Sequence, residues 1–175
     1  MLEKDTLFIS HIHEELDAAL ALQRFITSQL GPARIEVFLA SDPEQIRPGE
    51  RWLERIRVEL RKAKITVLFL SRASIQRPWV NFEGGAAWIM GQVLIPVCTA
   101  GLTVHDLGRP YSDFEAIELR DDHGAHSLLS GIAKALRLPP VIPVPPRLVG
   151  RPSRFANSGA YERLAVALRP YGYQE

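Results

Sequence analysis

The sequence predicts an α/β protein built on one parallel β-sheet. Short apolar runs that suit buried strands alternate with longer segments whose apolar residues recur at helical spacing. Parallel strands need a crossover connection, usually a helix, so this alternation favours a parallel sheet covered by helices. The chain has 175 residues, which is enough for one domain with a substantial core.

Five strands are expected from apolar runs bounded by turn residues. They are Thr6–Ser10, Ile35–Ala40, Ile65–Ser71, Val93–Cys98 and a weaker Phe114–Leu119. Four helices separate or follow them: Glu14–Leu30, Glu50–Ala63, one that begins at Pro78, and Ala125–Leu136. Gly31 and Pro32 end the first helix, and Pro96 indicates a position near the edge or end of its strand. Turn residues predict a loop over Ser41–Gly49, and Gly101–Ser112 is expected to be irregular.

The composition changes after Leu138. Pro139–Pro146 is rich in proline and predicts an extended, polyproline-like segment, followed by a short helix over Tyr161–Leu168. We therefore expect a domain over residues 1–138 and an extension over 139–175 that wraps the core or contacts a neighbour.

Charge and cysteine content exclude several classes of protein. A net charge of +1 gives no electrostatic reason to expect nucleic acid as the main partner. Cys98 is the single cysteine, so no internal disulfide is possible, and no Cys/His cluster with metal-ligand spacing exists. The first residues lack a signal-peptide pattern, and no apolar run approaches the roughly 20 residues that span a bilayer. We expect a soluble cytoplasmic protein without a membrane partner.

Residues Arg77–Trp88 form the stretch most suggestive of a site. Pro78 suits the first position of a helix, and the spacing of the apolar residues predicts that Trp79, Phe82, Ala86, Ile89 and Met90 face inward. Glu83 lies one turn into this helix, where the helix N-terminus favours a carboxylate. Gly84 and Gly85 indicate close approach by another backbone or by a ligand. Glu83 is thus either the chemical centre or simply a favourable acid near a helix start.

Four segments, in the right order, resemble the TIR (Toll/interleukin-1 receptor) domain. Asp5–Ser10 resembles the opening strand of the family, and Asp42–Trp52 resembles the loop after its second strand. Ile65–Ser71 with Ser74 and Trp79–Glu83 resembles the third strand and the segment that carries the glutamate of the NAD-cleaving members. Val93–Val97 resembles the fourth strand. The match covers about residues 5–137 and looks more like bacterial TIR proteins than animal adaptors.

The resemblance implies a flavodoxin-like sheet with strand order 2-1-3-4-5. Ligands in open α/β sheets bind beyond the carboxyl ends of the strands where the order reverses, which here lies between strands one and three. Glu83 falls at this crevice, and we expect its carboxylate to face a cavity rather than to be closed in an ion pair. The candidate substrate-binding residues are Phe8, Ser10, His11, Arg47, Arg51, Ser71 and Trp79.

The resemblance implies NAD+ glycohydrolase activity with Glu83 as the catalytic residue. A carboxylate beside the ribose stabilises the positive charge that develops as nicotinamide leaves. The products would be nicotinamide and ADP-ribose, a cyclic isomer or an adduct. The chain lacks Gly-x-Gly-x-x-Gly and a phosphate-cradling Gly-Lys-Ser/Thr loop, so NAD+ is expected as a substrate, with no cofactor. Core packing for Trp79, turn capping for Ser10 and a solvated face for Arg47 and Arg51 remain alternatives.

The implied partners are NAD+, further copies of the chain and a downstream effector in antiviral defence. In enzymatic TIR assemblies a neighbouring subunit typically completes the site, often through the loop that matches Asp42–Trp52. Two other functions remain open: a non-enzymatic interaction module, and a nucleoside or nucleotide N-glycosidase or deoxyribosyltransferase of similar fold.

Overall fold

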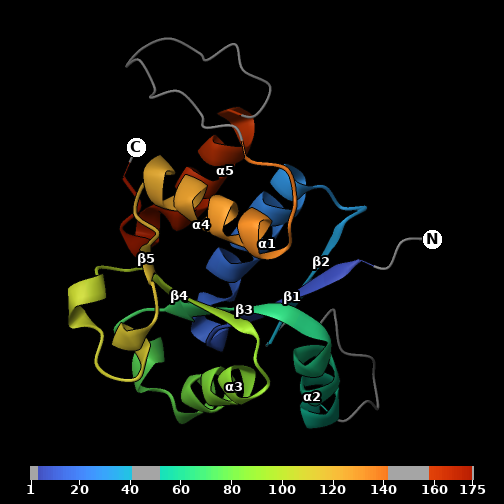
Figure 1. Ribbon diagram of the computed structural model, residues 1–175. Coiled ribbons are helices and arrows are strands. Elements are labelled where there is room, and N and C mark those ends of the chain that lie inside the picture. Colours follow the sequence, from blue (N-terminus) through green and yellow to red (C-terminus); the bar gives the residue numbers. More distant parts are fainter. Residues whose placement is uncertain (1–3, 41–51, 142–157, 175) are drawn as a thin grey trace.

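The computed structural model describes residues 4–40, 52–141 and 158–174. Its centre is a five-stranded, all-parallel sheet with strand order β2-β1-β3-β4-β5, which confirms the predicted flavodoxin-like topology (Figure 1). The strands are β1 (Asp5–Ser10), β2 (Ile35–Leu39), β3 (Ala63–Leu70), β4 (Val93–Cys98) and β5 (Ile117–Glu118). The sequence order reverses between β1 and β3, so the carboxyl ends of these two strands define the topological switch point.

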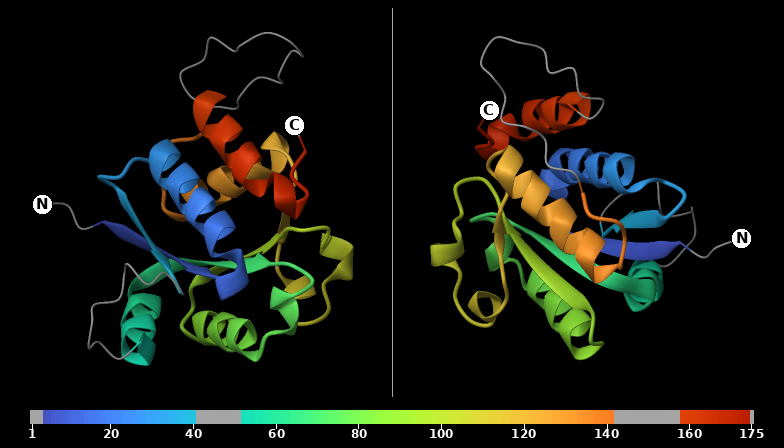
Figure 2. Two further views of the ribbon diagram at one scale, coloured as in Figure 1. Left: turned by 180° about the vertical axis from the view of Figure 1, so that it is seen from behind. Right: turned by 45° about the horizontal axis from the view of Figure 1, so that its top comes forward.

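Helices cover both faces of the sheet. They are α1 (Leu16–Leu30), α2 (Trp52–Lys62), α3 (Pro78–Ile89), α4 (Asp122–Ala135) and α5 (Ser158–Leu168). Helices α1, α4 and α5 lie on one face, and α2 and α3 lie on the other, as Figures 1 and 2 show from opposite sides. Short 3₁₀ turns occur at η1 (His13–Glu15), η3 (Ser74–Gln76), η4 (Val104–Asp106), η5 (Tyr111–Asp113) and η6 (Arg169–Tyr171).

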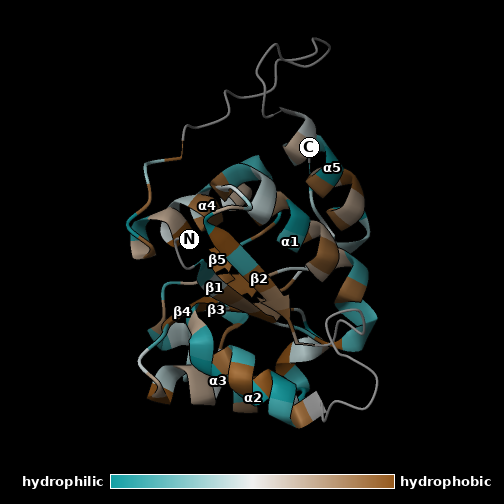
Figure 3. Ribbon diagram, turned by 90° about the vertical axis from the view of Figure 1, so that its right-hand side faces the viewer, coloured by the Kyte–Doolittle hydropathy of each residue, from teal (hydrophilic) through white to brown (hydrophobic). Residues whose placement is uncertain are grey.

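The core consists of two apolar layers separated by the sheet, whose hydrophobic strands lie between the helices in Figure 3. Strands β1 and β3 are buried on both faces, as expected for central strands of a parallel sheet. Helix α1 buries Leu22, Phe25 and Ile26, which recur at helical spacing.

Pro96 shows how the sheet tolerates a proline near its edge. Cys98 accepts a hydrogen bond from Leu119 N–H on the β5 side, and Pro96 presents its backbone to the same side. β5 pairs with β4 only at Val97 and Cys98, so the missing N–H of Pro96 breaks no ladder bond. Pro96 therefore lies where no backbone N–H is needed, close to the edge of the sheet, which agrees with the position near an edge or strand end that the sequence predicted. The fifth strand, however, has two residues rather than the six predicted.

The orientation predicted for α3 is wrong. Phe82 is 64% exposed and Ile89 is 80% exposed, and Met90 is also exposed. The buried residues of the helix are instead Val80, Glu83, Gly84 and Ala87. The helix approaches the sheet through small residues: a Cβ at Gly84 would lie 3.0 Å from Cδ1 of Leu68 in β3. In α2, Leu53 is likewise 55% exposed, whereas Ile56 and Leu60 at helical spacing from it are buried.

Helix α5 packs on the domain core rather than standing apart from it. The rings of Phe25 in α1 and Tyr161 in α5 meet edge to face with centroids 4.8 Å apart. The Tyr173 hydroxyl donates a 2.9 Å hydrogen bond to Asp122 of α4. Most of the proline-rich segment lies outside the described residues, and the division of the chain at residue 138 stays a prediction. Among the residues described, no helix combines the length and apolar character that crossing a bilayer requires.

Candidate active site

Polar side chains gather at the switch point from three parts of the chain. Ser10 is the last residue of β1, Ser71 directly follows β3, and Glu83 lies in the second turn of α3. All three are almost fully buried. This is the edge of the sheet at which ligands of open α/β proteins bind.

The carboxyl of Glu83 is held by two neutral donors. Ser10 Oγ donates to Oε2 at 2.5 Å, and Trp79 Nε1 donates to Oε1 at 2.8 Å. Trp79 is four residues before Glu83, so the helix places the indole N–H beside the carboxyl. Among the described residues, no basic side chain forms an ion pair with Glu83. The structure therefore brings together three residues that the sequence singled out.

Burial without a positive partner shifts the protonation of Glu83. Desolvation raises the pKa of Glu83 from the ordinary 4.5 to about 7, against the opposing effect of the hydrogen bonds from Ser10 and Trp79. An acid whose pKa lies near neutrality at a switch point is a candidate functional group, because such a shift costs stability and is common at active sites.

A second buried carboxyl, Glu15, was not anticipated. Glu15 of η1 is 4% exposed, and its Oε1 accepts a hydrogen bond from Ser71 Oγ. Its other oxygen, Oε2, has no hydrogen-bond partner among the described residues. Burial raises the pKa of Glu15, opposed by the hydrogen bond from Ser71. In the sequence, Glu14 and Glu15 look like solvated acids at the start of the first predicted helix, so nothing in the pattern marks Glu15 as buried.

Glu15 and Ser71 also fix the segment that leads into α3. Ser71 Oγ accepts the N–H groups of Ala73 and Ser74 at 3.1 Å each, which holds the turn after β3. Arg77, at the start of α3, forms a 2.7 Å ion pair with Glu14. Two interactions, Ser71 with Glu15 and Arg77 with Glu14, thus connect the loops after β1 and β3. Together they position the helix that carries Glu83.

The other residues predicted to bind substrate lie in different surroundings. Phe8 is fully buried and stacks on Phe38 with centroids 5.6 Å apart, so the expectation that it lines a crevice is wrong: its side chain belongs to the core beneath the site. His11 is buried, and its Nδ1 lies 3.3 Å from the carbonyl oxygen of Ile9. Trp79 is partly exposed and stacks on Phe82. Arg47 and Arg51 lie outside the described residues.

The prediction that the Glu83 carboxylate faces an open cavity is wrong. The side chain is 1% exposed, although no ion pair with another described residue closes it. A hollow of about 980 Å³ lies instead between α3 and the segment that joins β4 to β5, and Glu83 does not line it. Its walls include Asn81, Gly85, Trp88 and Tyr111. The sequence did not predict this hollow, because the apolar residues of the segment before β5 follow no helical or strand spacing, so the course of that segment could not be inferred.

The fold and this arrangement agree with a comparison against protein families. The model of the TIR domain family matches residues 7–129, which is more than half of the chain. The chain therefore belongs to the TIR domain family, as the resemblance of four segments of its sequence had indicated. None of the curated proteins compared with the chain matches it.

A solved structure shares this fold. A metazoan TIR-STING receptor from C. gigas aligns with a TM-score of 0.52 and 24% identity, covering 76% of this chain. The alignment covers 40% of that receptor chain, so this chain spans less than half of its length. A 2-desoxiribosyltransferase from Leishmania mexicana aligns with a TM-score of 0.41 and 17% identity over 54% of this chain and 65% of the other. The first likeness supports the fold alone, and the second supports no conclusion.

Proposed function

We propose that this TIR domain is an NAD+ glycohydrolase of the bacterial type and that Glu83 is its catalytic residue. One observation carries the proposal: a carboxyl at the switch point is buried against the hydroxyl of Ser10 and the indole N–H of Trp79, with no described cation beside it. A purely structural position is better filled by a neutral or apolar residue, because burying an unpaired carboxylate is unfavourable.

The chemistry that this carboxylate supports is cleavage of the nicotinamide–ribose bond. The bonding electron pair leaves with nicotinamide, whose ring thereby loses its positive charge, and C1′ of the ribose acquires oxocarbenium character. The Glu83 carboxylate stabilises that charge electrostatically. A water oxygen then bonds to C1′ and releases a proton, which yields ADP-ribose; attack by another nucleophile yields a cyclic isomer or an adduct. NAD+ is consumed as a substrate, and no cofactor takes part.

Substrate access requires a change around Glu83, because the side chain is closed in the described form. The hydrogen bonds from Ser10 and Trp79 are both neutral, so a ribose hydroxyl that replaces one of them preserves the hydrogen bonding of the carboxylate. We expect association of copies to favour the open form, so that activity rises more than linearly with protein concentration. Antiviral signalling or NAD+ depletion in the cytoplasm is the role this activity would serve.

The second candidate is a non-enzymatic interaction module. It is favoured by the 1% exposure of Glu83 and by the separate hollow beside α3. In that case Glu83 positions the start of α3 through Ser10 and Trp79 and never meets a substrate.

Product analysis separates the two candidates. Concentrated protein is incubated with NAD+, and nicotinamide and adenine-containing products are resolved by chromatography. Glu83→Gln keeps the size of the side chain and removes its charge, and it should slow nicotinamide release by about 10²–10³-fold. Glu162→Gln, an exposed glutamate on α5, is the matched control and should leave the rate unchanged. Equal rates for wild type and Glu83→Gln would exclude catalysis by Glu83, and faster cleavage of pyrimidine nucleosides than of NAD+ would favour an N-glycosidase or deoxyribosyltransferase.

A further inference from the structure

The ring of Phe82 lies beside the candidate site without joining the core. It is 64% exposed, whereas Val80 and Ala87 of the same helix are fully buried. The ring stacks on Trp79, with centroids 5.4 Å apart and an angle of 26° between the planes. An aromatic pair of this kind stabilises a particular ring orientation beyond the area that it buries. Phe82 therefore contacts the residue that donates a hydrogen bond to Glu83.

Helical spacing arranges the three side chains around the indole. Phe82 and Glu83 come three and four residues after Trp79, so they lie one turn further along α3 and flank the indole on its two sides. The indole presents a face to Phe82 and its Nε1–H, in the plane of the ring, to Oε1 of Glu83 at 2.8 Å. A rotation of the indole that breaks the stack also turns Nε1 away from the carboxyl. The stack and the hydrogen bond thus require the same orientation of Trp79.

The hydrogen bond from Trp79 affects the protonation of Glu83. Burial raises the pKa of Glu83 to about 7, and the hydrogen bonds from Ser10 and Trp79 oppose this because they favour the carboxylate. Titratable side chains also lie on the neighbouring segments: His11 after β1, Glu15 in η1, Arg55 in α2 and Arg77 before α3. Within the part of the chain that the structure describes, none of these contributes to the raised pKa of Glu83. A change in the hydrogen bond from Trp79 therefore acts on that pKa directly.

We propose that Phe82 is a positioning residue, whose ring holds the Trp79 indole in the orientation that donates to Glu83. The proposed cleavage of NAD+ depends on ionised Glu83, so this inference deepens the proposed function and rests on it for the effect on the rate. Phe82 needs no contact with the substrate, because it acts through Trp79. An aromatic ring at an exposed position next to Glu83 then has a physical reason.

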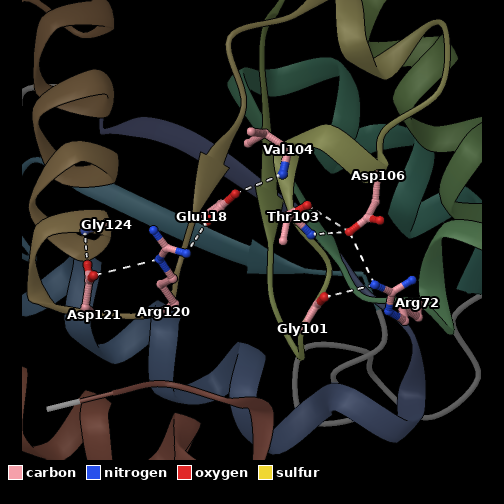
Figure 4. Close-up of polar contacts among 9 residues, drawn as sticks. All are labelled: Arg72, Gly101, Thr103, Val104, Asp106, Glu118, Arg120, Asp121 and Gly124. Atoms are coloured by element: carbon pink, nitrogen blue, oxygen red, sulfur yellow. Dashed lines mark hydrogen bonds and ion pairs between the residues drawn. The ribbon is translucent and has the colours of Figure 1, made fainter.

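Trp88 provides a matched control on the same helix. It is also 64% exposed, but it lines the hollow between α3 and the segment that joins β4 to β5. Nine residues, or about 13 Å along the helix axis, separate it from Trp79. Across the hollow, Arg72 bonds to the carbonyl oxygen of Gly101 at 3.2 Å and to Asp106 at 3.3 Å, contacts that do not involve Trp88 (Figure 4). Trp88→Ala thus removes an equally exposed ring without changing the surroundings of the Trp79 indole.

The first test follows the protonation of Glu83 through stability and needs no substrate. The free energy of unfolding in urea is measured from about pH 4.5 to about pH 9 for wild type, Phe82→Ala, Phe82→Tyr and Trp88→Ala, each with and without Glu83→Gln. The difference between a protein and its Glu83→Gln counterpart isolates the titration of Glu83. Phe82→Tyr keeps a ring that can stack, and Phe82→Ala removes the ring from an exposed position, so no cavity opens.

The expected result is a shift of the stability curve in Phe82→Ala alone. The stability that protonated Glu83 contributes is present below about pH 4.5 and is lost as the pH rises through the folded pKa. In Phe82→Ala the pH at which this loss levels off should rise by about 0.3–1 pH unit, because the weakened hydrogen bond no longer lowers the pKa. Phe82→Tyr and Trp88→Ala should match wild type. An unshifted curve for folded Phe82→Ala, or an equal shift in Trp88→Ala, would overturn the inference.

The pH dependence of kcat/KM for nicotinamide release is the second readout. Phe82→Ala should lower the rate about 2–10-fold below pH 7 and approach wild type by about pH 9, where Glu83 is ionised in both proteins. Phe82→Tyr should restore the wild-type profile. Loss by the same factor at every pH would show a role in packing alone and would overturn the inference. If none of the proteins cleaves NAD+ while the stability curve shifts as expected, the proposed function fails and the role of Phe82 towards Trp79 and Glu83 stands.

Discussion

Replacing Glu83 by Gln should stabilise the protein in a pH-dependent manner. In the folded state the carboxyl has a pKa of about 7, whereas an unfolded chain returns it to about 4.5. The pKa is higher in the folded state, so the fold favours the protonated form of Glu83. The stability that this protonated form contributes is fully present below about pH 4.5 and is lost as the pH rises through about 7. A glutamine is neutral throughout. Its amide can accept the Trp79 N–H and donate to Ser10, so both hydrogen bonds survive.

The size of the effect follows from the two pKa values. Each pH unit between them is worth about 1.4 kcal/mol, so at pH 8 ionised Glu83 costs on the order of 3 kcal/mol relative to its protonated form. In thermal unfolding this corresponds to roughly 6–12 °C for a chain of this size. The free energy of unfolding of Glu83→Gln, relative to that of wild type, should therefore increase by about 3 kcal/mol between pH 4.5 and pH 8.

Urea unfolding at a series of pH values measures this difference directly. Glu162→Gln provides the control, and its difference from wild type should stay flat. If the stability difference between Glu83→Gln and wild type does not change with pH, or if glutamine becomes relatively less favourable towards pH 8, the carboxyl is not a buried acid with a raised pKa, and the reasoning fails.

Other variants probe the surroundings of Glu83. Ser10→Ala removes a hydrogen bond that lowers the pKa of Glu83, so the pKa should rise further and the loss of stability should move to higher pH in the same urea series. Gly84→Ala should be less stable than Gly85→Ala by about 1–3 kcal/mol, because a Cβ at Gly84 meets Leu68 at 3.0 Å while Gly85 faces open space; thermal unfolding compares them. Glu15→Gln should stabilise the protein as the pH rises, since burial raises the pKa of Glu15, and equal stability across pH would contradict this.

The layered fold could be predicted from sequence because its signals are strong and local. The apolar runs and helical spacings located each strand and helix near its observed position, and the family resemblance supplied the strand order. β5 was overestimated because its apolar residues continue beyond the short pairing with Val97 and Cys98. Apolar content alone does not reveal where ladder hydrogen bonds stop.

The candidate site was predictable in part. The switch-point rule places the end of β1 and the start of α3 together, and the spacing of Trp79 and Glu83 sets their contact. The orientation of α3 was not predictable from hydrophobicity, because the helix buries Glu83 and Gly84 and leaves Phe82 and Ile89 in water. This inversion conflicts with local preference, and such conflicts are expected where function rather than packing determines the residues.

The pH dependence of nicotinamide release from NAD+ tests the central claim most directly. If ionised Glu83 stabilises the positive charge that develops on the ribose as nicotinamide departs, kcat/KM of wild type should rise with pH along a single titration with a midpoint near 7. Glu83→Gln should retain only a residual rate without that titration. A wild-type rate that is flat from pH 5 to pH 9, or a titration that persists in Glu83→Gln, would show that another group carries the reaction.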